Sequence, residues 1–360
     1  MFYDVIIVGG GPAGSTAGIV LSKAGFNVLI LDKAKFPRDK LCGGALTFKT
    51  ELLLKKIGIF DYDSIIDYKT KEYGIFWKTR EIFKGKSNYN FLFVKRKVYD
   101  FFLLEKAREK GAKVLENQKV IDIDFSRKTI ITSSGKSFRY KYLIGADGVN
   151  SIVRKLAEKQ GLIKNLRWKE NLANAIEIYI DRKFLKNKID YPYIILGYVN
   201  WGYSWIFPNK NQVVLGIGGL ISKNKDLSKK FYSFLNDFIS DYKPDKILGH
   251  TIPFGNYIRK PVFKNILLVG DAGGITNPAS GEGIYSAQKS GELAGVSIIQ
   301  AEKNKKDLEK TYTYLLNNFV YKEFDRDQKI RNIAYPLSNP FFTKWIFNIF
   351  SKKLEKIIHL

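Results

Sequence analysis

The segment that decides the fold is "YDVIIVGGGPAGSTAGIVLSKAGFNVLILDK", residues 3–33. It begins with an apolar, β-branched run at residues 3–8, continues with glycines in the spacing G-x-G-x-x-G, and ends with a second apolar run before Asp32. An apolar run of this kind is typical of a parallel strand that is buried on both faces. The segment therefore predicts a strand, a tight turn, a helix and a second strand.

The glycines and the acid of this segment indicate a ligand. Gly9 permits a tight turn, Gly11 lets the backbone approach a pyrophosphate, and Gly14 lets the helix pack closely on the strand. The N-terminus of that helix presents free N–H groups and the positive end of its dipole to the phosphates. Asp32 is placed to accept hydrogen bonds from a ribose. We predict a dinucleotide site, with an ordinary βαβ unit as the alternative.

Two later segments repeat the order of strand, glycine-containing turn and helix. The first is "YKYLIGADGVNSIVRKLA" at residues 140–157, with Asp147 in its turn. The second is "NILLVGDAGGITNPASGEGIYSAQKSGELAG" at residues 265–295, with Asp271 just past the strand and a helix that opens near Gly281. Ligands of open parallel sheets bind beyond the carboxyl ends of the strands. We therefore expect three strand ends to converge on one ligand.

The three segments, at residues 9–14, 145–154 and 270–284, resemble the fingerprints of the FAD-dependent hydroxylase and reductase superfamily. The resemblance implies that FAD is the cofactor, that Asp271 binds its ribityl chain, and that the helix from Gly283 onward points its N-terminus at the flavin pyrimidine. There a helix dipole stabilises the negative charge of reduced flavin by up to ~2 kcal/mol. The residues expected to bind the cofactor are Gly9, Gly11, Pro12, Ala13, Gly14, Asp32, Lys33, Cys42, Gly43, Gly44, Arg96, Asp147, Gly270, Asp271, Gly281, Gly283 and Ile284.

Two of these assignments have alternatives. Arg96 opens the amphipathic segment "RKVYDFFLLEKAREKGAKV" and resembles the superfamily arginine that contacts the cofactor from a helix start. The alternative is a solvated basic cluster that Arg96 forms with Lys95 and Lys97. Asp147 either contacts the cofactor or only holds its turn.

The only cysteine of the chain lies in "PRDKLCGGAL", residues 37–46, directly before two glycines. "KLCGG" at residues 40–44 and "GYSWIFP" at residues 202–208 together resemble the geranylgeranyl reductase family. In that family, reduced FAD saturates C=C bonds of isoprenoid chains on archaeal ether lipids, chlorophyll precursors or quinone-type tails. The resemblance places Cys42 and its glycines beside the flavin ring, which the backbone can approach because glycine has no Cβ atom. It places Tyr203, Trp205 and Phe207 near the substrate pocket.

Saturation of a C=C bond requires a hydride for one carbon and a proton for the other. We predict that Cys42 is a catalytic residue and name it as a candidate proton donor, although a free thiol is a weak acid; a pocket-wall role and an inert role are the alternatives. Two other functions are compatible with the motifs. One is a flavin-dependent monooxygenase or halogenase that acts on an aromatic small molecule, and the other is a non-catalytic prenyl-binding carrier.

Residues 191–219 have a hydrophobic period of two, which predicts antiparallel strands. Trp201, Tyr203, Trp205 and Phe207 are spaced by two and are expected on one face. A broad aromatic face suits a long hydrocarbon better than a charged metabolite. The alternative is a sheet that packs its aromatic rings on its own helices. Residues 73–94 also have a strand pattern and are expected to join this sheet.

Composition limits the partners. Lys and Arg number 60 and Asp and Glu 35, which gives a net charge of +25 and favours acidic partners. The sequence contains one dinucleotide fingerprint, so we expect NAD(P)H or an acidic ferredoxin to bind only transiently as electron donor. No nucleic-acid-binding module is recognisable, and we expect no such partner. One cysteine and two histidines make a disulfide framework and a metal site improbable.

The predicted fold class is α/β, with a Rossmann-like FAD-binding domain, an antiparallel-sheet substrate domain and a C-terminal helical tail. The first domain is expected at residues 1–70, 92–165 and 259–305, the second at 71–91 and 166–258, and the tail at 306–360. Residues 340–360 place aromatic residues at helical spacing before several lysines, a pattern of helices that lie on anionic membranes. A helix packed on the domain is the alternative. We expect a cytoplasmic protein that contacts the membrane peripherally.

Overall fold

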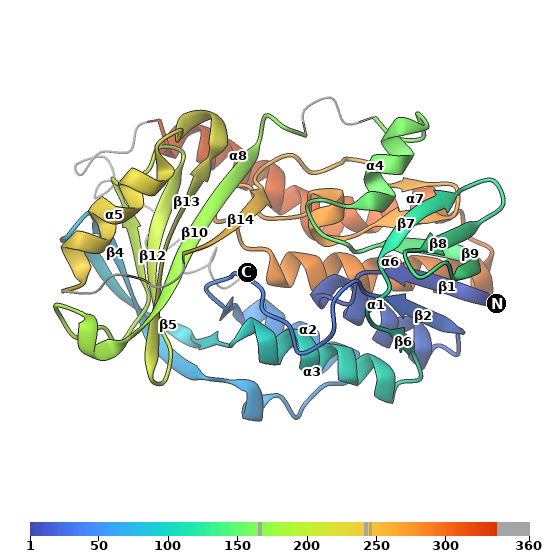
Figure 1. Cartoon of the computed structure of the whole chain (residues 1–360), viewed down its shortest axis with the longest axis horizontal. Coiled ribbons are helices and arrows are strands. Elements are labelled where there is room, and N and C mark those ends of the chain that lie inside the picture. The colour runs from blue at the N-terminus through green and yellow to red at the C-terminus, as the bar shows by residue number, and fades with distance from the viewer. Residues whose placement is uncertain (165–167, 241–243, 245–246, 337–360) are drawn as a thin grey trace.

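The computed structural model describes residues 1–164, 168–240, 244 and 247–336. Two sheets lie side by side along the long axis of the molecule (Figure 1). Sheet A contains parallel strands and sheet B is mainly antiparallel. The predicted α/β fold class is confirmed.

The centre of sheet A is parallel, in the order β16-β9-β1-β2-β6. Its strands are β1 (Phe2–Val8), β2 (Val28–Leu31), β6 (Lys113–Leu115), β9 (Ser137–Gly145) and β16 (Ile266–Leu268), with β15 (Val262–Phe263) at one edge and the hairpin of β7 (Val120–Asp124) and β8 (Thr129–Thr132) beside β9. Val8 pairs with Gly145 across the sheet, and Gly145 pairs with Leu268. The carboxyl ends of β1, β9 and β16 are therefore level, as the sequence predicts.

Helices cover both faces of sheet A. Val5 and Ile7 face the core that contains α1 (Pro12–Lys23), α2 (Phe48–Ile57), α3 (Arg96–Glu109) and α6 (Ile284–Asn304). Ile6 and Val8 face a second core with α4 (Ile152–Lys159). Because successive side chains of a strand point to opposite faces, a strand between two helical layers is apolar throughout. The continuous apolar run of β1 has this cause.

Sheet B has the order β14-β10-β13-β12-β11-β4-β5-β3. Its strands are β3 (Ala45–Leu46), β4 (Tyr68–Trp77), β5 (Arg80–Phe93), β10 (Leu172–Asp181), β11 (Tyr193–Leu196), β12 (Gly202–Pro208), β13 (Gln212–Leu220) and β14 (Leu248–Pro253). The expectation that residues 73–94 form strands of this sheet is confirmed. On one face, Phe231 and Phe234 of α5 (Leu227–Phe238) pack in a core with Ile178 and Ile206. The other face is free of α5.

Trp201 lies outside the strand that carries the other aromatic residues of "WGYSWIFP", and its place on their face stays a prediction. It precedes β12 with a φ of +50°, and its ring stacks on that of Tyr335 with 6.4 Å between centroids. The alternation of side chains holds only within extended backbone, and a positive φ interrupts it.

The described part of the chain after α6, up to residue 336, is mainly helical, as predicted, with α7 (Leu308–Leu316), the π-helical turn η5 (Asn317–Tyr321) and α8 (Lys322–Ala334). Short 3-10 turns are η1 (Asp63–Ile65), η2 (Arg182–Phe184), η3 (Ile221–Lys223) and η4 (Gly270–Gly273). The Tyr312 hydroxyl donates to the Leu268 carbonyl at 3.0 Å and so ties α7 to sheet A.

None of the helices within the described ranges combines the length and the apolar character that a membrane span requires. The predicted membrane-binding segment, residues 340–360, lies outside the described residues, and the domain limits stay a prediction.

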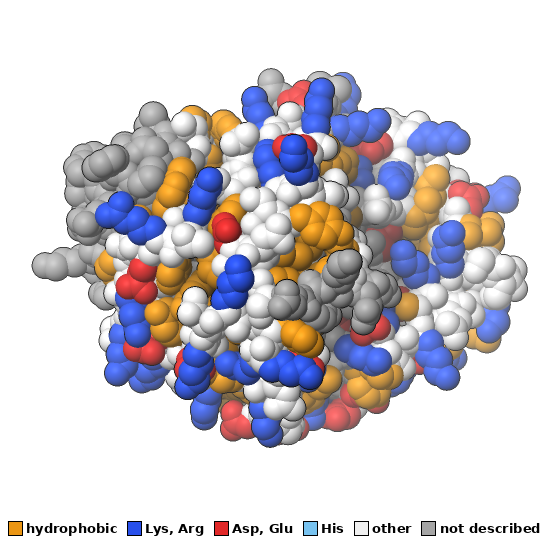
Figure 2. Space-filling model, turned by 60° about the vertical axis from the view of Figure 1, so that its left-hand side comes forward, with side chains coloured by type: hydrophobic (Ala, Val, Ile, Leu, Met, Phe, Trp, Pro, Cys, Tyr) orange, Lys and Arg blue, Asp and Glu red, His pale blue; other side chains and the backbone are white. Residues whose placement is uncertain are grey.

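The basic side chains do not gather in one stripe on the face that Figure 2 shows. Lys and Arg side chains are spread over that face, with Asp and Glu side chains and hydrophobic groups among them. Such a distribution favours a general attraction to anionic surfaces.

Candidate active site

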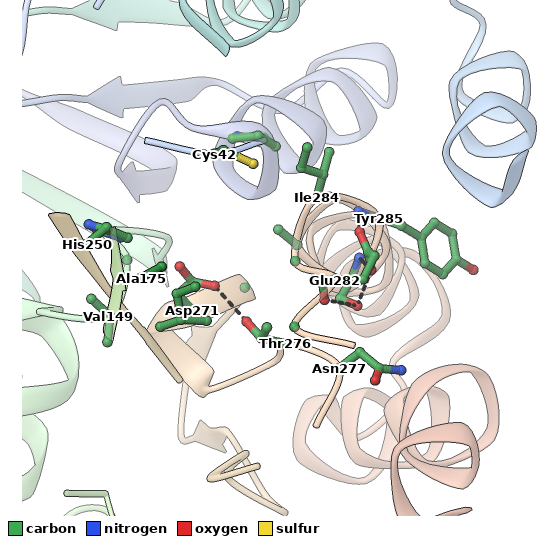
Figure 3. Close-up of a pocket in the computed structure, with 18 of the residues that line it drawn as sticks. Cys42, Val149, Ala175, His250, Asp271, Thr276, Asn277, Glu282, Ile284 and Tyr285 are labelled. Atoms are coloured by element: carbon green, nitrogen blue, oxygen red, sulfur yellow. Dashed lines mark hydrogen bonds between the residues drawn. The ribbon is translucent and has the colours of Figure 1, made fainter. Parts of the chain in front are cut away.

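A cavity of about 1390 Å³ lies between the carboxyl edge of sheet A and sheet B. Its walls include the turn after β1, the loop that carries Cys42, the first turn of α6, and the faces of β10 and β12. Figure 3 shows Cys42 on one side of the pocket, with Asp271 and the start of α6 on other sides. The three glycine-containing segments and the aromatic strand therefore border one space.

All the predicted site residues except Gly14 line this cavity. A Cβ atom at Gly14 would lie 1.9 Å from the carbonyl oxygen of Gly9, so this glycine is required for the close packing of α1 against the end of β1. The residues that line the cavity are Gly9, Gly11, Pro12, Ala13, Asp32, Lys33, Cys42, Gly43, Gly44, Arg96, Asp147, Tyr203, Trp205, Phe207, Gly270, Asp271, Gly281, Gly283 and Ile284. Their contacts with a cofactor or substrate stay a prediction.

The turn after β1 has the features of a phosphate site. Gly11 is the N-cap residue of α1 and no side chain caps the helix. A Cβ atom at Gly11 would contact only Arg38, through Nη2 at 3.5 Å. Asp32 accepts the N–H of Gly10 through Oδ2 and that of Ala34 through Oδ1, each at 2.8 Å. Each carboxylate oxygen has a second lone pair, so Asp32 can hold the turn and also accept a ribose hydroxyl.

Asp147 carries a buried oxygen that has no partner. Its Oδ2 accepts the N–H of Ile152 at 2.6 Å and so holds the start of α4, whereas Oδ1 is buried without a hydrogen bond to any described residue. Burial raises the pKa of this carboxyl. An unpartnered buried acceptor costs ~1–3 kcal/mol, which a ligand hydroxyl would recover. The turn-holding role and a ligand role are thus both available to Asp147.

Arg96 is buried beside Cys42 rather than part of a solvated cluster. Its Nε and Nη2 donate to the two oxygens of Asp100 at 2.7 and 2.9 Å. Arg38 also contacts Asp100, at 3.2 Å. Burial opposes the charge of Arg96, but Asp100 and then Cys42 outweigh it and raise the pKa of the guanidinium. Two cations and one carboxylate leave positive charge at the cavity, which suits an anionic ligand.

The start of α6 carries a carboxylate that the sequence analysis missed. Glu282 accepts the N–H of Tyr285 at 2.6 Å and the hydroxyl of Ser286 at 2.9 Å (Figure 3). Burial raises the pKa of Glu282. When ionised, Glu282 offsets part of the positive helix end that faces the cavity. Nearby, Asp271 accepts the hydroxyl of Thr276 at 2.9 Å.

Lys40 and His250 form a second unpredicted contact in the cavity wall, with 2.5 Å between Lys40 Nζ and His250 Nε2. Burial lowers the pKa of Lys40 to about 8, despite the opposing charge of Asp271. Burial, followed by the charge of Lys40, lowers the pKa of His250 to about 4. Histidine is therefore neutral and accepts a hydrogen bond from lysine. The two residues are 210 positions apart, so local sequence gives no signal for the contact.

The loop with the cysteine is shaped by contact with β12. A Cβ atom at Gly43 would lie 2.5 Å from the Phe207 ring, and one at Gly44 would lie 2.0 Å from the carbonyl oxygen of Val94. Both glycines are thus required for packing of this loop within the protein itself. The Cys42 N–H donates to Oε1 of Glu177 at 2.8 Å, and the Cys42 carbonyl accepts the Tyr179 hydroxyl at 3.0 Å.

These residues fit FAD. The uncapped start of α1, the acceptor Asp32 at the end of β2 and the free oxygen of Asp147 offer partners for a pyrophosphate and for hydroxyl groups. They surround a cavity large enough for a dinucleotide and a further ligand.

Comparisons with known proteins agree with this fit. A model of the FAD binding domain matches residues 2–177. An uncharacterized protein of Methanosarcina barkeri is 34% identical over 311 residues, which cover 84% of this chain and 76% of that protein. Menaquinone reductase of Mycobacterium tuberculosis is 30% identical, with 81% of this chain and 75% of that protein covered. Digeranylgeranylglycerophospholipid reductase of Methanosarcina mazei is 26% identical, with coverage of 99% and 90%.

A solved structure shows the same fold. The crystal structure of a geranylgeranyl bacteriochlorophyll reductase-like protein from Thermoplasma acidophilum matches with a TM-score of 0.84 and 20% identity, over 97% of this chain and 91% of that one. The cofactor of this chain is FAD. The motifs, the cavity and these relatives identify the chain as a member of the geranylgeranyl reductase family of FAD-dependent oxidoreductases.

Proposed function

We propose that this enzyme saturates C=C bonds in isoprenoid lipid chains of the geranylgeranyl type. The observation that carries the proposal is the aromatic wall of the cavity. Tyr203 and Trp205 are 5.8 Å apart between ring centroids, and Trp205 and Phe207 are 6.4 Å apart. Opposite Tyr203 in β13 lies Gly218, which adds no side chain to the wall. A continuous apolar surface of this kind accommodates a hydrocarbon chain and has few partners for a polar metabolite.

The proposal assigns the cofactor to the sheet A side of the cavity. Gly9, Gly11 and the N-terminus of α1 would hold the pyrophosphate, Asp32 a ribose, and Asp271 the ribityl chain. When bound and reduced, FAD supplies the hydride for one carbon of the double bond. The protein must then position that bond, exclude water and deliver a proton to the neighbouring carbon.

The proposal also includes partners of the reaction. NAD(P)H or an acidic ferredoxin would bind transiently as electron donor, in keeping with the net charge of +25. Residues 340–360 would contact an anionic membrane surface from the cytoplasmic side, where lipid substrates are available.

A single anaerobic experiment tests the reaction. The FAD-loaded protein is reduced chemically and mixed with a lipid that carries geranylgeranyl chains. We expect reoxidation of the flavin and products whose mass increases by two hydrogens per reduced bond. A chain that leaves the lipid unchanged, but hydroxylates or halogenates an aromatic compound when oxygen is admitted, would be a monooxygenase or halogenase instead. A chain that binds the lipid without flavin reoxidation would be a carrier.

A further inference from the structure

Glu177 is an acid in an otherwise apolar part of the cavity wall. It lies on β10, lines the cavity, and its side chain has no exposed surface. In sheet B it pairs with Gly216, which in turn pairs with Trp205. A Cβ atom at Gly216 would lie 2.3 Å from the Trp205 ring, so the indole extends over the glycine toward the acid. Of the described acids that line the cavity, Glu177 alone belongs to a strand of sheet B.

The two carboxyl oxygens of Glu177 have different surroundings. Oε1 accepts the N–H of Cys42 at 2.8 Å and lies 3.1 Å from the Tyr179 hydroxyl. Oε2 is buried and has no hydrogen-bond partner among the described residues. In a neutral carboxyl group, the oxygen that accepts an N–H acts as the carbonyl oxygen and the other oxygen carries the proton. The proton of Glu177 therefore belongs on the oxygen that is free to donate.

The surroundings favour a protonated carboxyl near neutral pH. Burial raises the pKa of Glu177 to about 7. The groups that oppose this effect are the Tyr179 hydroxyl, the Cys42 N–H, the charge of Arg96 and the Trp205 indole, in that order. Arg96 is itself paired with Asp100 through two hydrogen bonds. A general acid is most effective when its pKa lies near the working pH.

We propose that Glu177 is the proton donor for the C=C bond, an inference that rests on the proposed reductase function. The O–H bond at Oε2 breaks and a C–H bond forms on one alkene carbon, directly or through one water molecule. The other carbon receives the hydride equivalent of reduced FAD, so the pair adds two hydrogens. The resulting carboxylate is held by the Cys42 N–H, and the single proton of the Tyr179 hydroxyl can turn from the Cys42 carbonyl to Oε1. Solvent protonates the carboxylate again before the next turnover.

The replacement Glu177→Gln tests the proposal because the amide keeps the shape and the acceptor at Oε1 but cannot donate a carboxyl proton. We expect isoprenoid reduction to fall by at least about 100-fold, the usual contribution of a general acid. FAD content and chemical reduction of the bound flavin should stay unchanged. Glu109→Gln serves as the matched control, since Glu109 is a carboxylate on α3 that is 54% exposed and outside the cavity wall.

The pH profile separates an acid from a structural residue. Turnover of the parent enzyme should be constant below pH about 7 and fall about tenfold per pH unit above it, because only the protonated carboxyl donates. The Glu177→Gln variant should lack this decline. Infrared spectra should show the C=O stretch of a neutral carboxyl that disappears as the pH rises through the same range, and the variant should lack that band. The infrared readout requires no turnover.

Tyr179→Phe provides a second variant if Glu177→Gln does not fold. Loss of the hydroxyl removes a group that favours the carboxylate, so the alkaline decline should move to higher pH. A decline at unchanged pH would contradict the proposal, as would normal reduction by Glu177→Gln with an unaltered pH profile. If the parent enzyme reduces no isoprenoid, the proposed reductase function is wrong. In that case there is no alkene for Glu177 to protonate.

Discussion

At the scale of single residues, the backbone and the side chain of Cys42 make different contacts in the cavity wall. The backbone N–H and carbonyl of Cys42 hold Glu177 and Tyr179, whereas the sulfur accepts a weak contact from the Gly44 N–H at 3.5 Å and lies beside the guanidinium of Arg96. The loop is therefore linked to the acid of sheet B through main-chain atoms. A side-chain replacement at residue 42 leaves those hydrogen bonds in place.

Cys42→Ala tests the thiol directly. We expect lower turnover with FAD still bound, because the thiol fills part of the cavity wall, but a smaller loss than in Glu177→Gln. Steady-state reduction of a geranylgeranyl lipid and the flavin absorbance of the purified variant measure the two effects. Turnover equal to that of the parent would remove the thiol from the mechanism. A larger loss than in Glu177→Gln, with no alkaline decline, would make the thiol the proton donor.

At the scale of elements, the contact between α1 and α6 positions the turn after β1 relative to the start of α6. Gly291 and Gly295 face α1 one turn apart on α6. A Cβ atom at Gly291 would lie 2.2 Å from the backbone oxygen of Ala13, and one at Gly295 would lie 2.8 Å from a methyl group of Val20. The first contact meets the backbone of the predicted cofactor site, and the second meets a side chain that can shift.

Gly291→Ala should push α6 away from α1 and weaken both the fold and FAD binding. We expect a loss of ~1–3 kcal/mol in the free energy of unfolding, the usual range for overpacking, together with a lower FAD content. Denaturant titration and the flavin absorbance of the purified protein measure these quantities. Gly295→Ala is the matched control, because it brings the same gain in helix propensity with a milder clash. Equal stability of the two variants would contradict this account of the contact.

At the scale of the whole molecule, the cavity exists because the carboxyl edge of sheet A and one face of sheet B border the same space. Sheet A supplies the turns that are predicted to bind the cofactor, and sheet B supplies the aromatic wall and Glu177. The basic side chains on the face in Figure 2 are spread over the surface around this core. If the substrate lies in an anionic membrane, as proposed, the basic surface would be attracted to it over about a Debye length.

The protein should bind vesicles that contain anionic lipid and release them at high salt. Each basic residue near such a surface contributes about 1 kcal/mol, and added salt screens the attraction. Cosedimentation with anionic and with neutral vesicles measures the effect. Deletion of residues 340–360 should reduce binding, because their aromatic and lysine pattern is the predicted contact. Undiminished binding of the shortened chain would assign the contact to another part of the surface.

The sequence by itself determined the βαβ unit, the level ends of three parallel strands, the cofactor class and the aromatic strand. These features depend on local patterns: glycine spacing, apolar runs and the two-residue period of β12. Trp201 marks the limit of that reasoning, because a period of two has no meaning where the backbone leaves the strand with a positive φ.

Only the tertiary structure decided the partners of the acids and cations in the cavity. Glu177 stands out in "LANAIEIYI" as one acid in an apolar strand, yet its burial, its contact with the Cys42 N–H and its free Oε2 arise from strands and loops far apart in the chain. The contact of Lys40 with His250 has the same origin. Charge states depend on desolvation and on neighbours within a few ångströms, and these distances exist only once the edge of sheet A lies against sheet B.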